Sequence, residues 1–147
     1  MTAPNPEGAR RCIRGALADA GVGADAIDAI NGHLTATYAD PHEIRNWSEG
    51  LGRGPKDFPY VNSTKSMIGH CLGAAGAIES VASILELHRG FMHPSINCED
   101  VHPEIEPFTG AIVRECMNFP KLKMLAKASF GFGDVNSCLI FKKWDNH

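Results

Sequence analysis

The chain has 147 residues, with 14 Lys and Arg against 17 Asp and Glu and a formal net charge of -3. This length suits one domain with its own core, and neither composition nor repeats suggest a second. The balanced charge argues against nucleic acid as a partner. The apolar runs are too short for a membrane span, and the N-terminus lacks a secretory signal. We expect one domain over residues 1–147, in the cytoplasm or an organelle matrix.

Five cysteines occur without a C-x-x-C pair, and seven histidines form no H-x-x-x-H or H-E-x-x-H pair. An odd number of cysteines fits poorly with a closed disulfide framework, so we expect reduced thiols. The histidine spacing does not predict a metal site, although a metal hydrolase stays open as an alternative.

The first part of the chain predicts a helix, a strand and a second helix. Residues 7–20 have apolar side chains at helical spacing and stop at Gly21. Residues 27–31 read as a short strand that ends next to Gly32 and His33. Residues 40–47 then predict another helix.

The middle of the chain contains the strongest helix signal. A short strand over 58–61 is followed by a helix over 74–87. One face of that helix is apolar and consists of Ala74, Ala77, Ile78, Val81, Ile84 and Leu85. Glu79, Ser83 and Glu86 lie off this face.

The last part of the chain is irregular and then forms two strands. Four prolines punctuate residues 92–121, which leaves room only for brief strands such as 111–114. Residues 123–130 and 138–143 predict a hairpin around the turn 131–134. Helices that alternate with strands before a hairpin indicate an α/β layered domain.

The stretch VNSTKSMIGHCLGAAGAIE, residues 61–79, places Lys65, His70 and Glu79 around a strand-to-helix turn. Its glycines leave little side-chain bulk, so backbone amides can approach a bound group closely. This composition predicts one wall of an active site.

Four motifs stand in order along the chain: NGHLTAT at 31–37, KSMIGHCLGAAGAIE at 65–79, HPSIN at 93–97 and SFGFGDVN at 129–136. They resemble N-A-H-G-T-x-T, K-S-x-x-G-H-x-x-G-A-A-G-A-x-E, P-P-T-I-N and S-F-G-F-G-G-T-N of the β-ketoacyl-acyl-carrier-protein synthases, the condensing enzymes of the thiolase fold. The resemblance covers the C-terminal half of such an enzyme. It implies an α/β, thiolase-like half-domain: a mixed β-sheet with helices on its faces, lacking the first strand of that half.

The resemblance implies an acyltransferase that joins an acyl thioester to malonyl carrier protein with loss of carbon dioxide, in fatty-acid or polyketide synthesis. His33 and His70 would donate the two N–H groups that stabilise the enolate. Lys65 would pair with Glu79 and keep His70 placed and uncharged. A purely structural salt bridge is the alternative for Glu79.

Further roles follow from the same resemblance. Thr35 and Thr37 would contact the phosphopantetheine arm, Phe132 would gate the site, and Phe130 would line the acyl pocket. Ordinary strand-end positions and core packing are the respective alternatives. The resemblance implies no metal and no organic cofactor. Its partner is an acyl carrier protein with a phosphopantetheine-linked acyl or malonyl group, and the complete enzyme would be a homodimer.

Three departures from the family pattern stand out. The family's nucleophilic cysteine lies in the other half of the fold, and neither Cys12 nor Cys71 has a context that replaces it. The half's first, central strand should precede this chain, and its absence predicts an open ladder, exposed apolar surface and dependence on a partner chain. Leu34 replaces a glycine next to His33, which we expect to alter the backbone there.

Besides the metal hydrolase, two functions therefore remain open from the sequence. The first is the C-terminal part of a synthase whose nucleophile comes from a missing N-terminal half. The second is a non-catalytic subunit, similar to a chain-length factor, that acts only by assembling with a partner chain.

Overall fold

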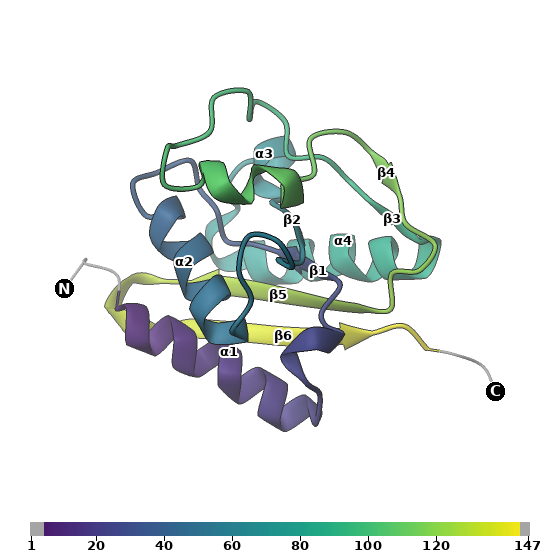
Figure 1. The fold of residues 1–147 in the computed structure, drawn as a ribbon, viewed down its shortest axis with the longest axis horizontal. Coiled ribbons are helices and arrows are strands. Elements are labelled where there is room, and N and C mark those ends of the chain that lie inside the picture. Colours follow the sequence, from purple (N-terminus) through teal and green to yellow (C-terminus); the bar gives the residue numbers. More distant parts are fainter. Residues whose placement is uncertain (1–4, 145–147) are drawn as a thin grey trace.

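A computed structural model describes residues 5–144 and contains a four-stranded mixed sheet in the order β2-β1-β5-β6 (Figure 1). Strand β1 is parallel to both β2 and β5, whereas β5 and β6 form an antiparallel hairpin. The strands are β1 Ala29–Asn31, β2 Tyr60–Asn62, β5 Met124–Phe130 and β6 Asn136–Lys142. The predicted α/β architecture and the hairpin are confirmed.

Helices cover both faces of this sheet. Helices α1 (Pro6–Ala20) and α2 (Asp40–Leu51) pack on one face, and α4 (Ala75–Arg89) packs on the other (Figure 1). The shorter elements are η1 Ala24–Ala26, α3 Lys65–Ile68, η2 Leu72–Ala74, β3 Phe91–Met92, η3 Glu106–Ala111, β4 Met117–Asn118 and η4 Phe132–Asp134.

Each long helix ends at a glycine in the left-handed region. Gly21, Gly52 and Gly90 have φ values of 63°, 65° and 69°, a conformation that costs a residue with a Cβ atom about 1 kcal/mol. The expected stop of the first helix at Gly21 is therefore confirmed. The second helix runs four residues beyond the predicted end, because its real terminator is Gly52.

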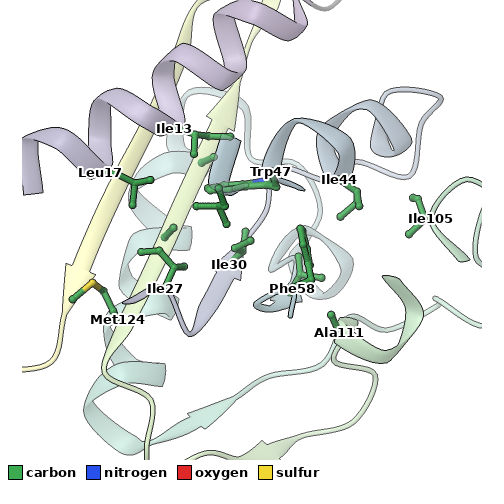
Figure 2. Close-up of a cluster of buried hydrophobic side chains, with 14 residues drawn as sticks. Ile13, Leu17, Ile27, Ile30, Ile44, Trp47, Phe58, Ile105, Ala111 and Met124 are labelled. Atoms are coloured by element: carbon green, nitrogen blue, oxygen red, sulfur yellow. The ribbon is translucent and has the colours of Figure 1, made fainter. Parts of the chain in front are cut away.

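The main core lies between the sheet and the helices α1 and α2. Ile13 and Leu17 of α1 and Ile44 and Trp47 of α2 face Ile30 of β1 (Figure 2). Trp47 is fully buried. Burying each large apolar side chain contributes about 1.5–3 kcal/mol, so this layer holds the chain segments on either side of β1 in place.

Helix α4 turns its polar face toward the sheet. Glu79, Ser83 and Glu86 are buried, while the entire apolar face identified from the sequence is exposed, with Val81 58% accessible. An amphipathic surface helix ordinarily does the reverse. The reason lies in the sheet, where Asn62 and Lys127 bind the carboxylates of this helix directly.

The expected open ladder in the middle of the sheet is wrong. Strand β1 pairs directly with β5 through Ala29↔Leu125, Ile30↔Ala126 and Asn31↔Lys127, and Asp28 N–H donates to the Met124 carbonyl at 3.0 Å. The backbone groups of both strands are thereby satisfied without a strand between them. The expected exposed apolar surface exists, but it lies on α4. Residues 1–4 lie outside the described residues.

The irregular segment contains more regular structure than the sequence indicates. The brief strand expected at 111–114 is reduced to one parallel bridge, Val61↔Ile112, next to η3. The two-residue strands β3 and β4 pair with each other and were not predicted. In the part of the chain that the structure describes, no helix combines the length and apolar character needed to cross a membrane.

The inverted orientation of α4 makes a prediction for stability. Val81→Ala should change the unfolding free energy by less than about 0.5 kcal/mol, because the side chain is mostly in solvent. Leu87→Ala, at a buried position of the same helix, should cost about 2–5 kcal/mol. Urea denaturation of the two variants compares these values. Equal losses at both positions would show that the apolar face is packed rather than exposed.

Candidate active site

The loop after β1 is held by two carboxylates from the first turn of α2. Glu43 accepts the backbone N–H groups of His33 at 2.7 Å and Leu34 at 2.9 Å. Asp40 accepts those of Thr35, Ala36 and Thr37 at 3.0–3.4 Å. Five consecutive backbone donors thus meet two acidic side chains near a helix N-terminus, where negative charge is favoured. This explains the acidic residues that follow the first motif.

Burial makes Glu43 an unusual carboxylate. Desolvation raises its pKa to about 7, against the hydrogen bonds from His33, Leu34 and the Trp47 indole, which favour the charged form. By accepting the N–H groups of His33 and Leu34, Glu43 fixes the backbone position of His33.

The expected distortion at Leu34 is absent. The non-glycine residue with positive φ in this loop is Ala36, at 57°, and not Leu34. Instead, the two unusual residues of the first motif fit each other. A Cβ atom on Gly32 would lie 3.0 Å from Leu34 Cγ and 2.9 Å from Glu43 Oε1. The motif's Ala and Gly are therefore replaced as a pair, with Gly32 making room for Leu34.

The two predicted histidines lie together. The rings of His33 and His70 have centroids 5.1 Å apart and an interplanar angle of 84°. They come from the ends of neighbouring parallel strands, His33 directly after β1 and His70 after β2 and α3. Parallel strands end at the same edge of a sheet, so the fold itself brings the two loops together.

The two imidazoles differ in their surroundings. The Leu72 backbone N–H donates to His70 Nδ1 at 3.1 Å, which leaves the proton of the neutral ring on Nε2. The pKa of His33 is lowered to about 4, first by burial and then by the charges of Lys65 and His70. His33 is therefore uncharged at neutral pH.

A buried charge cluster lies beside the histidines. Glu79 Oε1 is 2.5 Å from Lys65 Nζ and Glu79 Oε2 is 2.7 Å from Lys127 Nζ, and each side chain is at most 3% accessible. The predicted pairing of Lys65 with Glu79 is present. Lys65 Nζ has no directed hydrogen bond of its own, so this ion pair compensates its burial.

The sequence analysis missed Lys127. Its Nζ also donates to the Ala128 carbonyl at 2.8 Å and to Ser129 Oγ. The available signal was a single charge inside the otherwise apolar strand MLAKASF. Strand alternation puts Lys127 on the same face as Leu125, toward α4, and a lysine at an inward position needs a partner there.

A cavity of about 760 Å³ opens next to this cluster. Thr35, Thr37, Lys65 and His70 line it, and the hydroxyl oxygens of the two threonines are 3.2 Å apart. The segment 95–102 forms the opposite wall. This size suits a small-molecule chain with a few polar groups.

The two predicted phenylalanines lie elsewhere. Neither Phe130 nor Phe132 lines the cavity. Phe130 packs against the main core, and Phe132, in η4, is 84% exposed. Within residues 5–144, no group of three His, Cys, Asp or Glu side chains is arranged to hold a metal ion.

The fit between Gly32 and Leu34 predicts a measurable coupling. Gly32→Ala should destabilise the chain by about 1–3 kcal/mol through overpacking. In a Leu34→Ala background the loss should be smaller, because the atoms that the new methyl group meets are gone. A double-mutant cycle of unfolding free energies measures the difference, and strictly additive values would refute the pairing.

The comparisons with known proteins agree with this geometry. A family model described as the C-terminal domain of β-ketoacyl synthases matches residues 1–99. The chloroplastic 3-oxoacyl-[acyl-carrier-protein] synthase II of Arabidopsis thaliana is 43% identical over 96% of this chain and 26% of its own length. The 3-oxoacyl-[acyl-carrier-protein] synthase 1 of Haemophilus influenzae is 40% identical over 99% of this chain and 34% of its own length.

Solved structures give the same result. The ishigamide ketosynthase/chain length factor superposes with a TM-score of 0.89 and 34% identity, covering 98% of this chain and 34% of that one. The chain thus spans about a quarter to a third of the proteins it matches. It has the thiolase-like fold of the ketosynthases, and it belongs to the β-ketoacyl synthase family, whose C-terminal domain it matches.

Proposed function

We propose that this chain supplies the decarboxylation side of a 3-oxoacyl-[acyl-carrier-protein] synthase site. The observation that carries the proposal is the edge-to-face pair of His33 and His70 above a buried Lys65–Glu79 ion pair. Two imidazole rings side by side suit an oxyanion that develops during reaction, because each can donate an N–H group to it.

The chemistry follows from the two donors. When a malonyl thioester loses carbon dioxide, the electrons of the broken C–C bond form an enolate, and negative charge builds on the thioester oxygen. The N–H groups of His33 and His70 would donate to that oxygen. Lys65, held by Glu79, adds positive charge nearby and disfavours protonation of His33.

The cavity suits the arm that delivers the substrate. We assign Thr35 and Thr37 to contacts with the phosphopantetheine chain of an acyl carrier protein, since both line the cavity with His70. A type II polyketide acyl-carrier protein has been solved in complex with its ketosynthase, which is 31% identical to this chain with a TM-score of 0.86. Phe132 keeps its proposed role as a gate, and Phe130 its role beside the acyl pocket.

The acyl-carrying nucleophile would come from another stretch of polypeptide. Burial raises the pKa of the Cys12 thiol and raises that of Cys138 to about 12, which disfavours the thiolate in both. The exposed apolar face of α4 is a surface that the remaining part of the enzyme or a partner subunit would cover. We further propose a homodimer of the complete enzyme, in the cytoplasm or an organelle matrix.

A second function is an assembly subunit without catalysis. The observation in its favour is the same uncovered face of α4, which calls for a partner whether or not the site is active. The ishigamide protein named above pairs a ketosynthase with a chain length factor. Activity that depends on His33 and His70 separates the two functions.

A chimera tests the proposal. In it, this chain replaces the matching third of the Haemophilus influenzae synthase, and carbon dioxide release from malonyl carrier protein is measured. We expect release, reduced about 10²- to 10³-fold by either His33→Ala or His70→Ala. His42→Ala, at an exposed position of α2, is the matched control and should leave release unchanged. A folded chimera without release, or with release that survives both substitutions, would favour the assembly function.

A further inference from the structure

Lys127 is a second buried cation paired with Glu79, which already pairs with Lys65. Glu79 divides its carboxylate, Oε1 to Lys65 and Oε2 to Lys127 at 2.7 Å, and all three side chains are nearly inaccessible. With one carboxylate and two ammonium groups, the cluster carries a formal charge of +1. Desolvation lowers the pKa of Lys127, whereas the contact with Glu79 raises it.

Stability alone does not account for this arrangement. Glu79 is neutralised by Lys65, and an apolar residue on β5 would continue the surface begun by Leu125. Replacing buried charges with apolar groups of similar size is often neutral or stabilising. The presence of a second buried ammonium group, that of Lys127, therefore needs an explanation other than stability.

The reason lies in what Glu79 would do without Lys127. A carboxylate near an imidazole favours the imidazolium, and Glu79 acts in this direction on His33. Lys127 occupies the oxygen that Lys65 does not reach, so neither oxygen is available to the rings. It also leaves the cluster with positive charge, which opposes protonation of His33.

We propose that Lys127 is a positioning residue, which engages the second oxygen of Glu79 and gives the buried cluster the net positive charge that keeps His33 uncharged. The role assigned to Lys127 rests on the proposed function, in which an uncharged His33 donates its N–H group. Its physical content is the protonation state of His33, which can be measured without any substrate.

The groups around His33 define the expected direction of change. Lys65, His70 and Lys127 lower its pKa and Glu79 raises it, while Glu43 holds its backbone N–H. Removal of the Lys127 charge leaves Lys65 and Glu79 as a neutral pair. The pKa of His33 should then rise from about 4 toward the ordinary value of about 6.5.

The experiment is an NMR titration of the histidine side chains in the 147-residue chain. Lys127→Met should raise the pKa of His33, while the larger effect of burial stays in place. Lys123→Met makes the same chemical change at an exposed position just before β5 and should leave the pKa of His33 where it is. Lys127→Gln, which keeps a hydrogen-bonding group but no charge, should behave as Lys127→Met.

Three results would overturn the proposal. An unchanged His33 titration in folded Lys127→Met or Lys127→Gln would show that the charge has no effect on the ring. A neutral amine signal for Lys127 in the unsubstituted chain at pH 7 would remove the charge itself. Unfolding of both variants would assign Lys127 to holding β5 against α4 only. Each of these leaves the chimera assay intact, so failure here and failure of the proposed function are distinguishable.

Discussion

One buried carboxylate joins the three parts of the structure that make the site. Glu79 stands on α4 and binds Lys65 at the start of α3 and Lys127 in β5. Through Lys65 it is tied to the segment that ends in His70, and through Lys127 to the strand paired with β1, which leads to His33. An unpaired charge in such a place costs several kcal/mol, so these contacts help to hold the three elements in their relative positions.

The same contacts explain why the polar face of α4 is buried and its apolar face is exposed. A helix that must present Glu79 and Glu86 to a polar sheet surface cannot also present its apolar stripe there. Asn62 and the His93 backbone N–H both donate to Glu86 Oε1, so this second carboxylate is also bound on the buried side of the helix. The apolar stripe then faces outward. The chemistry of the site and the need for a covering partner are two consequences of one helix orientation.

Most elements, and the residues that come together in the candidate site, could be predicted from the sequence. Which face of each element is buried could not. The helix ends at Gly21 and Gly90 and the hairpin follow from local rules, and they are confirmed. Which face of α4 is buried depends on the residues that the sheet presents to the helix. The local periodicity of the helix sequence does not contain that information. Lys127 was missed for the same reason, since its partner lies 48 positions away in the chain.

The direct test of this account is the unfolding free energy of Glu79→Gln, measured by urea denaturation. The substitution keeps the size of the side chain and removes the charge that both lysines share. The account predicts a loss of about 3–5 kcal/mol, because two buried ammonium groups lose their counterion. A loss below about 1 kcal/mol would contradict it, since α3, α4 and β5 would then be held by something other than this carboxylate.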